Sequence, residues 1–533
     1  MRRFPWIRRL AADYAYDFGA VAPFYAGNPS ARADWARAIE RTTAHLRQRD
    51  AIASVVLAQQ VRRHAPARAL EQSAHLRDPR TVAILTGQQA GLFGGPLFTL
   101  LKALTALKLA ADVAAQHHVP AVAIFWIEAE DHDWDEVRSC TVFDAQLEPR
   151  TVGLAARTGA DSSPVADVAL DASIQSVLDE LGALLPPTEF TPGLLDELRQ
   201  LYAPGVGMAE AFARWLERVL GPRGLIVYDA SDPAAKPLAA GVFARELSTA
   251  GQTGRLASAS GSDMVARGYH AQVQTQADSV GLFKLSPGRR LIRCLGEELL
   301  VGDEKHAPAT LVQEAADRPG GFSPGVLLRP VVQDTLFPTV CYVAGPNELA
   351  YLGQLRGIYD HFGVPMPLMY PRASATILDS AAIRFLAKYQ VAIEALQSRD
   401  DGTLNALLET QIPPAVEAAF TAARGAVAAQ MATLTEGVRA IDPTLEGAAK
   451  STLGRMEHDL DTFHGKIIQA AKRRHETLRR QFDHARALAF PAAHAQERTI
   501  GFVWFLNQYG PALIDRLDEE LPLDMGHHWV VTI

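Results

Sequence analysis

Residues 81–140 constrain the fold more than any other part of the chain. Two apolar runs, 82–85 and 119–127, have the composition of buried strands, and the apolar stretch 97–115 between them has the length of a helix. Strand, helix and strand in this order predict a parallel βαβ crossover. Open parallel sheets bind ligands outside the carboxyl ends of their strands. The polar segments that follow the two strands are therefore the first candidates for function.

Other apolar runs continue this pattern along the chain. Residues 10–80 have helical periodicity, and later runs predict further buried strands at 225–228, 340–343 and 366–370. Short runs divided by turns at Pro287-Gly288 and Gly296-Glu297 predict a small antiparallel meander over 280–301. We therefore expect an α/β protein with a parallel core that inserted segments interrupt twice.

After Arg372 the composition shifts to helix formers and the strand signal nearly vanishes. Two helices joined at Asp442-Pro443 predict an antiparallel hairpin that projects as a coiled-coil arm. Because an apolar seam on such an arm needs a partner, we expect a homodimer; the alternative is an arm folded onto its own core. The seam residues at seven-residue spacing are Phe420, Val427, Leu434 and Ile441 in the first helix, and Leu453, Leu460 and Ile467 in the second.

The bulk composition narrows the class of protein. The chain has 533 residues, is 48% hydrophobic and carries a net charge of -8, with its basic residues scattered, so we expect no nucleic-acid partner. Charged residues interrupt the longest apolar runs, so we expect no membrane span. Three cysteines far apart in sequence suit a reducing cytoplasm and argue against a cysteine-rich zinc site.

The loop after the first strand is rich in glycine and amides. Its glycines would let backbone amides approach a ligand, and a helix starts next to it at Pro96, so we expect a carboxylate or phosphate there. The spacing matches neither a dinucleotide fingerprint nor a P-loop, and tight packing is the alternative role. The candidate binding residues are Gln88, Gln89, Gly94 and Gly95.

Six carboxylates lie between positions 128 and 136, directly after the second strand. Crowded like charges are costly unless an ammonium, a metal or a base relieves them. His132 lies between Asp131 and Asp133, so it is a candidate general base or metal ligand, and Glu130 is a candidate binding residue. The alternative is a solvated acidic turn with only one or two carboxylates facing inward.

Later predicted strand ends also carry polar side chains. Arg329 and Arg372 could hold a carboxylate or phosphate with two hydrogen bonds, although Arg329 could instead pair with Asp334. Further candidates at comparable positions are Gln333, Asn347 and Ser374. Polar residues at several strand ends of one chain favour a shared site.

Taken together, these segments resemble the bacillithiol-biosynthesis cysteine ligase family (BshC). The most specific features are Thr86-Gly87-Gln88-Gln89 and Glu130-Asp131-His132-Asp133 at this spacing. The resemblance implies a Rossmann-like core related to class I aminoacyl-tRNA synthetases, two connecting-peptide insertions, and a coiled-coil arm that dimerises. The matching stretches are 16–18, 27–29, 86–99, 125–136, 328–334, 344–351, 361–372, 496–498 and 505–510.

The implied reaction joins the carboxyl group of L-cysteine to the amine of glucosaminyl-malate, which forms bacillithiol. ATP with magnesium is the expected activator, although the chain has neither of the two short ATP-handling motifs of class I synthetases. The loop at Gln88 stands in place of the first motif and residues 371–374 stand near the second. The resemblance also implies a second nucleotide pocket near the arm, which cannot be assigned to residues.

These considerations give one set of expected roles. Gln88, Gln89, Gly94, Gly95 and Thr99 would bind the carboxylate or nucleotide, and no metal ligands are assigned. The remaining groups would be Asp131, His132 and Asp133 for catalysis, and Glu130, Arg329, Gln333, Asn347, Arg372 and Ser374 for binding. The expected domains are helices at 1–80, a Rossmann-like core at 81–378 with insertions at about 141–222 and 252–325, the arm at 379–490, and a segment at 491–533 that packs back on the core.

Two other functions stay open from the sequence. A hydrolase or transferase could use a divalent metal on the acidic cluster. A dimeric scaffold could bind a nucleotide or thiol-pathway intermediate without catalysis. Bound metal after purification would favour the first, and binding without turnover would favour the second.

Overall fold

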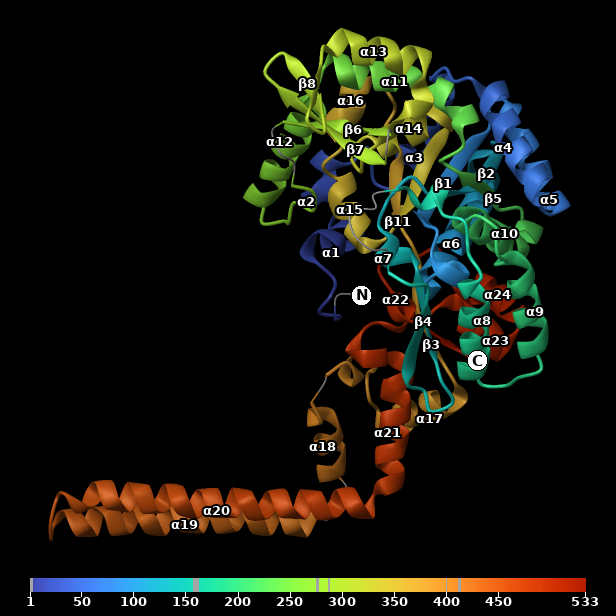
Figure 1. Cartoon of the computed structure of the whole chain (residues 1–533). Helices are drawn as coiled ribbons and strands as arrows, with labels where there is room; N and C mark the ends of the chain where they lie inside the picture. Colours follow the sequence, from blue (N-terminus) through green and yellow to red (C-terminus); the bar gives the residue numbers. More distant parts are fainter. Residues whose placement is uncertain (1–2, 157–162, 275–277, 286–287, 399, 411–413) are drawn as a thin grey trace. The chain divides into compact units, whose positions relative to one another are not determined.

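The computed structural model describes residues 3–156, 163–274, 278–285, 288–398, 400–410 and 414–533 (Figure 1). The chain forms two compact units. The larger unit comprises residues 1–376 and 496–531, and the smaller unit comprises residues 377–495 and 532–533. The chain therefore leaves the larger unit after residue 376, returns to it at residue 496, and ends with two residues of the smaller unit.

A five-stranded parallel sheet forms the core of the larger unit, in the order β12-β11-β1-β2-β5. This confirms the predicted parallel α/β core. β1 runs further than predicted, so that Gln88 and Gln89 are strand residues and Gln89 lies opposite Glu128 of β2. The strands are β1 (Val82–Gln89), β2 (Ala121–Glu128), β5 (Ile226–Asp229), β11 (Thr339–Ala344) and β12 (Leu368–Pro371).

The strand order reverses direction next to β1. The chain proceeds from β1 to β2 and β5 on one side, then returns to β11 and β12 on the other side. Such a reversal leaves a crevice between the two neighbouring strands, here β1 and β11, at their carboxyl ends. The fold thus marks one place in the sheet for a ligand before any side chain is considered.

Helix α6 (Leu97–His117) packs against β1, β2 and β11, and its mostly apolar residues explain its burial. α10 (Met208–Leu220) packs on β5, and α3 (Arg32–Ala44) packs on β11 and β1. Helices over residues 10–80 are confirmed. The other helices of this region and of the sheet crossovers are α1 (Arg9–Tyr16), α2 (Phe18–Val21), α4 (Arg49–Arg63), α5 (Ala67–Ala74), α11 (Lys236–Ser248), α14 (Arg329–Leu336), α15 (Pro346–Leu352) and α16 (Arg356–Phe362).

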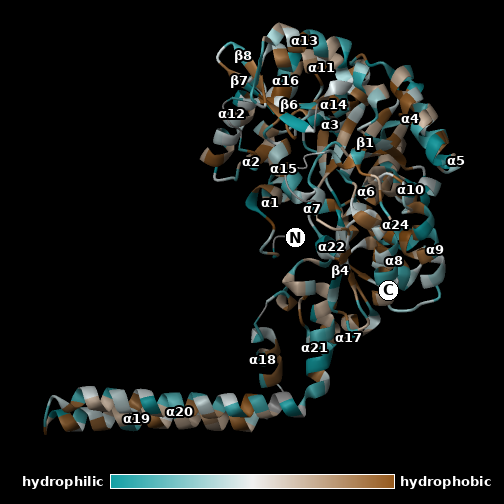
Figure 2. Cartoon of the chain, in the orientation of Figure 1, coloured by the Kyte–Doolittle hydropathy of each residue, from teal (hydrophilic) through white to brown (hydrophobic). Residues whose placement is uncertain are grey.

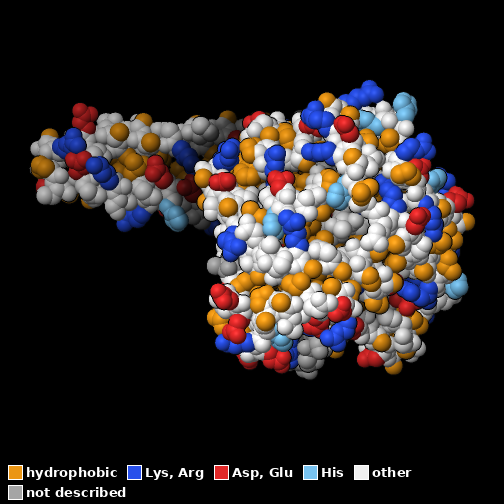
Figure 3. Space-filling model, turned by 90° about the horizontal axis from the view of Figure 1, so that it is seen from above, with side chains coloured by type: hydrophobic (Ala, Val, Ile, Leu, Met, Phe, Trp, Pro, Cys, Tyr) orange, Lys and Arg blue, Asp and Glu red, His pale blue; other side chains and the backbone are white. Residues whose placement is uncertain are grey.

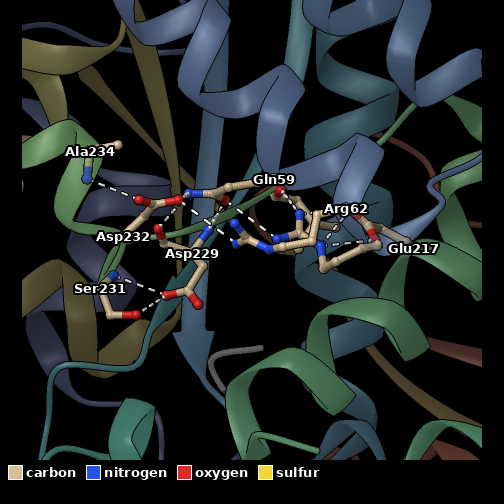
Figure 4. A network of polar contacts seen from close by, with 9 residues as sticks. Gln59, Arg62, Glu217, Asp229, Ser231, Asp232 and Ala234 are labelled. Atoms are coloured by element: carbon tan, nitrogen blue, oxygen red, sulfur yellow. Dashed lines mark hydrogen bonds and ion pairs between the residues drawn. The ribbon is translucent and has the colours of Figure 1, made fainter.

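The edge strand β5 is braced by side chains from α4 (Figure 4). The amide of Gln59 accepts a hydrogen bond from Asp229 N at 2.9 Å and donates one to Asp229 O at 3.0 Å, which imitates the pairing of another strand. Arg63 donates to Val227 O and forms a buried ion pair with Glu217 of α10. These bonds satisfy backbone groups that an edge strand would otherwise leave unpaired.

The first inserted region contains a hairpin that the sequence analysis missed. β3 (Ser139–Phe143) and β4 (Pro149–Gly153) pair antiparallel with β3 starting just beyond the acidic segment. The turn between them is held by Asp144, which accepts hydrogen bonds from the backbone of Gln146 and Glu148. The helices here are α7 (Trp134–Val137), α8 (Ser173–Leu184) and α9 (Thr191–Leu201).

The second inserted region forms the predicted meander as part of a five-stranded sheet, in the order β10-β6-β7-β8-β9. The expected turn at Pro287 lies partly outside the described residues. Its elements are α12 (Gln252–Ala266), β6 (Ser279–Leu285), β7 (Arg289–Leu295), β8 (Glu298–Val301), β9 (Glu304–His306), α13 (Pro308–Asp317) and β10 (Phe322–Pro324).

The C-terminal segment of the larger unit packs on α6 and β3. Leu97 N donates to Ile500 O and Phe502 N donates to Gly95 O, so the segment docks on the start of α6. Strand β14 (His528–Thr532) of this segment was not predicted, and neither was β13 (Ser374–Leu378) earlier in the chain. The helices are α22 (Gln496–Thr499), α23 (Phe502–Tyr509) and α24 (Ala512–Glu520).

The smaller unit contains the predicted helical hairpin, α19 (Pro414–Arg439) and α20 (Leu445–Arg474). Phe420 and Phe463 meet across it with ring centroids 5.7 Å apart. Apolar side chains remain at its surface, where hydrophobic and hydrophilic residues alternate along both helices (Figure 2); Leu434 is 57% exposed and Phe463 is 55% exposed. The other helices are α17 (Ser380–Tyr389), α18 (Gly402–Glu409) and α21 (Glu476–Ala489).

Basic and acidic side chains are interspersed over the face shown in Figure 3. Among the helices of the described residues, none is long and apolar enough to cross a membrane.

Candidate functional site

A pocket of about 330 Å³ opens at the carboxyl ends of β1, β2 and β11, where the strand order reverses. Its size is in the usual range for small-molecule sites. Charged side chains of both signs line it, together with aromatic side chains. The lining residues are Gly87, Gln88, Gln89, Phe98, Lys102, Trp126, Glu128, Asp131, Glu136, Val326, Arg329, Tyr342, Gly345, Asn347, Glu348, Tyr351, Arg372 and Arg498.

Lys102 connects α6 to β1 and to the start of α15, next to the place where the strand order of the sheet reverses. It projects from α6, is 2% exposed, and donates to Gly87 O of β1 at 2.8 Å and to Gln88 Oε1 at 3.1 Å. Its Nζ lies 2.5 Å from Glu348 Oε2 at the start of α15. Burial lowers the pKa of Lys102, and the Glu348 carboxylate opposes that shift. This buried lysine neutralises a carboxylate within the pocket wall.

Arg329 is held between both sides of the pocket. It donates to Gln333 Oε1 at 3.1 Å and to Tyr351 Oη at 3.1 Å, and its Nε lies 3.5 Å from Glu128 Oε2. The alternative in which Arg329 pairs with Asp334 is wrong. Burial raises the pKa of Glu128, and the neighbouring Arg329 opposes that shift.

Gln333 lies beneath the pocket and connects Arg329 to a buried acid. Its side-chain nitrogen donates to Asp334 Oδ1 at 2.9 Å, while its oxygen accepts from Arg329. Burial raises the pKa of Asp334 to about 6, although Tyr359 also donates to its carboxylate. Gln333 is 1% exposed and does not line the pocket, so the structure gives it a supporting position.

Asp131 lines the pocket with both carboxylate oxygens already engaged. Gln89 Nε2 donates to Oδ2 at 2.9 Å, and Oδ1 accepts from Arg289 Nη1 at 3.1 Å and from His132 N at 2.8 Å. Arg289 comes from β7 of the inserted sheet and also donates to Pro324 O. His132 Nδ1 lies 3.2 Å from Asp131 Oδ1, but the imidazole is 50% exposed and lies outside the pocket lining.

Arg372 reaches the pocket from the end of β12. It donates to Glu497 through Nη1 at 3.0 Å and Nη2 at 2.7 Å, and both side chains are buried. Ser374 also donates to Glu497 and is hydrogen-bonded to His528 Nδ1 at 2.7 Å. Ser374 therefore holds the C-terminal segment in place and does not line the pocket.

The remaining charges of the pocket are Arg498 and Glu136. Arg498 lies 5.7 Å from the centre of the Phe98 ring, a ring that Arg372 also approaches at 5.4 Å. Neither Arg498 nor the carboxylate of Glu136 forms an ion pair or hydrogen bond with another residue that the structure describes. Arg498 is partly open to solvent; its partial burial lowers its pKa, and Arg372 adds to that shift. Among the residues that the structure describes, the pocket thus offers one cation and one carboxylate without an ion-pair partner.

Several expected site residues lie elsewhere. The amides of Gly94 and Gly95 donate to Gly91 O at 3.0 Å and Leu92 O at 3.1 Å, so they are not free donors for a ligand. Thr99 is fully buried, and its hydroxyl has no partner among the described residues. Tight packing against Phe502 and Trp215, the alternative named above, explains Gly94.

The acidic segment divides into residues with different surroundings. Glu130 is 6% exposed and pairs with Lys236 of α11, away from the pocket. Asp133 caps α7 by accepting from Glu136 N at 3.1 Å. Within the described residues, no three His, Cys, Asp or Glu side chains are grouped to hold a metal ion. The metal-dependent alternative therefore has no ligand set in this part of the chain.

The pocket brings together six of the expected residues: Gln88, Gln89, Asp131, Arg329, Asn347 and Arg372. Lys102 and Arg498 also line the pocket, and neither was predicted from the sequence. A lysine within a buried apolar helix requires a buried partner, and this signal was present at Lys102. Arg498 gave no local signal, because its position depends on the return of the chain to the larger unit.

These features define a Rossmann-like α/β protein with a charged small-molecule pocket at the switch point of its sheet and a helical coiled-coil unit. Residues 3–373 match the family described as bacillithiol biosynthesis BshC, N-terminal Rossmann-like domain. Residues 375–533 match the BshC C-terminal coiled-coil domain. The chain belongs to the BshC family of bacillithiol biosynthesis.

Similar proteins cover nearly the whole chain. One from Salinibacter ruber is 34% identical over 98% of this chain and 96% of its own length. One from Chlorobaculum tepidum is 35% identical over 89% of this chain and 87% of its own, and one from Symbiobacterium thermophilum is 33% identical over 97% and 96%. All three carry the name "Putative cysteine ligase BshC".

Proposed function

We propose that this protein is a cysteine ligase that joins the carboxyl group of L-cysteine to the amine of glucosaminyl-malate, forming bacillithiol. The names of its relatives support the reaction class, since they are called cysteine ligases. The match to both BshC domains supports the pathway. The amide bond and the sugar-linked acid are the parts that this proposal adds.

The observation that carries the proposal is the distribution of charge in the pocket. Its cations Lys102, Arg329 and Arg372 each face a carboxylate, whereas Arg498 has no such partner among the described residues. An unpaired guanidinium beside an aromatic ring suits a carboxylate or phosphate, which it can bind with two hydrogen bonds. The malate carboxylates of glucosaminyl-malate provide such a group.

Arg372 and Asn347 complete this anion-binding wall. Of the five N–H bonds of Arg372, three are used by Glu497 and Ala373 O, which leaves two for a ligand. Asn347 lines the pocket at the start of α15. We assign the malate carboxylates to Arg498, Arg372 and Asn347, and the carboxyl group of cysteine to the side at Gln88 and Lys102.

ATP with magnesium is the activator that this proposal includes. The amides of Gly94 and Gly95 already donate to backbone carbonyls, so we do not assign the triphosphate to them, and Arg498 and Arg372 stay assigned to the malate carboxylates. The chemistry that ATP would supply is conversion of a carboxyl oxygen into a good leaving group. The residues of the chain bind and orient the reacting groups.

Dimerisation through the coiled-coil unit is part of the same proposal. Exposed apolar residues on α19 and α20, including Leu434 and Phe463, would be covered by a second copy of the chain. Replacing both with glutamate should convert a dimer to a monomer in sedimentation equilibrium, whereas Val61→Glu, an exposed apolar site on α4, should not. A wild-type chain that sediments as a monomer would refute this part.

The test of the binding assignment is the affinity for malate and glucosaminyl-malate in Arg498→Met, measured by calorimetry. Loss of a charge-assisted contact should weaken binding about 10- to 100-fold, which corresponds to ~1.4–3 kcal/mol. Arg516→Met is the matched control, because Arg516 lies on α24 and pairs with Glu520. Equal affinities in wild type and Arg498→Met would rule out the assignment.

A further inference from the structure

Four carboxylates line the pocket, and they differ in what already holds them. Glu348 accepts from Gly345 N at 2.6 Å and pairs with Lys102. Glu128 accepts from Trp126 Nε1 at 3.1 Å and faces Arg329. Asp131 accepts three hydrogen bonds, from Gln89, Arg289 and the backbone of His132. Glu136 alone makes no side-chain hydrogen bond or ion pair with the residues that the structure describes.

We propose that Glu136 is the catalytic base that takes the proton from the attacking amine of the substrate. This inference rests on the proposed function and adds a residue that the expected catalytic set, Asp131, His132 and Asp133, does not contain. It replaces His132, which lies outside the pocket lining, whereas Glu136 is part of that lining. A base must reach the proton that it removes, and Glu136 lines the pocket with a carboxylate that no other described residue binds.

The position of Glu136 is set by its short helix. α7 is anchored by Val137, which is fully buried, and by Trp134, whose indole Nε1 donates to Ala155 O at 2.8 Å. Asp133 caps the helix through Glu136 N. These contacts fix the backbone of Glu136, while its carboxylate stays available for a ligand.

The charged groups around Glu136 change the pKa of its carboxyl group. Glu136 is partly open to solvent; its partial burial raises its pKa, and the carboxylates of Asp133 and Asp131 in the same segment raise it further. Lys102 of α6 and Arg498 of α22 face it from the other side and oppose the shift. A carboxylate whose pKa lies above its ordinary value is a stronger base and matches an amine better near neutral pH.

The step is balanced as follows. The amine nitrogen forms the new C–N bond to the carboxyl carbon of cysteine, which carries a phosphate-type leaving group. The bond between that carbon and the leaving-group oxygen breaks, and its electron pair leaves with the oxygen. The proton lost by the nitrogen moves to the Glu136 carboxylate, which later returns it to water. Arg498, across the same pocket, would hold the negative charge of the acid portion.

The first experiment measures product formation with cysteine, glucosaminyl-malate and Mg-ATP across a range of pH. Glu136→Gln keeps the shape of the side chain and removes the base, so kcat should fall about 100- to 10,000-fold. The wild type should lose rate toward acidic pH, and this loss should disappear in Glu136→Gln. Asp135→Asn is the matched control, because Asp135 is 77% exposed, pairs with Arg138 and does not line the pocket.

The second experiment measures binding and does not require turnover. Glu136→Gln should weaken glucosaminyl-malate binding about tenfold and leave an analogue with hydrogen in place of the amine unaffected. Cysteine and 3-mercaptopropionate, which lacks the amine, form the other pair of ligands. Glu136→Gln could instead weaken the binding of cysteine and not that of 3-mercaptopropionate, while it affects glucosaminyl-malate and its amine-free analogue equally. That result would overturn the assignment to the attacking amine.

The outcomes separate this inference from the proposed function. Wild-type protein that makes no product refutes the proposed function, and the binding experiment then still decides where Glu136 acts. If the wild type is active, and Glu136→Gln keeps a kcat within threefold of the wild-type value and the same loss of rate toward acidic pH, Glu136 is not the catalytic base. If the loss of rate toward acidic pH disappears in His132→Gln and not in Glu136→Gln, the His132 imidazole is the base.

Discussion

Arg372 and Glu497 lie 125 positions apart in the sequence and form a buried ion pair with two hydrogen bonds, at 2.7 and 3.0 Å. Their side chains are 2% and 5% exposed. Burial alone would raise the pKa of Glu497, but the Arg372 guanidinium and the hydrogen bonds it receives hold that pKa below its ordinary value. Glu497 thereby positions a pocket arginine from the segment that returns after the coiled-coil unit.

Removing the Glu497 side chain should lower the stability of the folded protein. Glu497→Ala leaves the Arg372 guanidinium buried without its carboxylate, and breaking one side of a buried pair costs about 3–5 kcal/mol. We expect that loss in the free energy of unfolding measured in urea. Glu519→Ala, an exposed change on α24, should cost less than about 0.5 kcal/mol. A loss below ~1 kcal/mol for Glu497→Ala would contradict the structural role.

Lys102 and Glu348 should be energetically coupled. Lys102→Met and Glu348→Gln each leave one charge in the pocket wall, so the double variant should be more stable than the sum of the single effects predicts. We expect a coupling of about 1–3 kcal/mol from a double-mutant cycle. The exposed pair Lys305 and Glu298, 2.9 Å apart, serves as control with a coupling of about 0–1 kcal/mol. Equal couplings at both pairs would count against the buried ion pair.

The backbone conformation and the packing at position 94 require glycine, without any role in ligand binding. Its φ is 97°, and an added Cβ would overlap the Phe502 ring. Gly94→Ala should therefore cost about 2–5 kcal/mol from backbone strain and overpacking, visible as a lower unfolding midpoint. Gly193→Ala in α9, where a Cβ meets nothing within 4 Å, should be neutral or slightly stabilising. A neutral Gly94→Ala would contradict the packing.

The stability of the smaller unit should depend on the charge of His484. Its Nε2 lies 2.7 Å from Asp379 Oδ2, and the hydrogen bond to that carboxylate raises the pKa of His484. A raised pKa adds stability that is fully present below the ordinary histidine value of ~6.5 and is lost as pH rises through the folded value. Both side chains are about one-third exposed, so the effect should be about 0.5–1 kcal/mol.

Unfolding of wild type and His484→Gln at several pH values checks this dependence. The difference in free energy should be largest near pH ~5.5 and should shrink as the pH rises above ~6.5. His458→Gln on α20, where His458 is exposed, should show no such trend. A difference that grows with pH would contradict the sign of the pKa shift.

The sheet and its polar strand ends could be predicted because both are local in the sequence. Buried parallel strands are continuous apolar runs, and the residues that follow them must lie at the carboxyl edge, so Gln89, Asp131 and Arg329 could be assigned to one site. Helical periodicity likewise predicted the hairpin of α19 and α20.

The partners of these residues could not be predicted, because they depend on distant parts of the chain. Glu130 and Asp131 are neighbours in sequence, yet Glu130 turns to Lys236 and Asp131 turns to Arg289 and the pocket. Similarly, Glu497 and Arg498 follow one another, and one holds Arg372 while the other lines the pocket. Charge and spacing alone do not decide which of two adjacent side chains faces a ligand.

The most direct test of the ligase proposal is mass spectrometry of the products formed from cysteine, glucosaminyl-malate and Mg-ATP by the purified full chain, with ATP omitted in parallel. The proposal predicts a product with the mass of both substrates less one water, formed only with ATP and reduced at least tenfold in Arg498→Met at subsaturating substrate. A folded wild-type protein that forms no such product would contradict the proposed function.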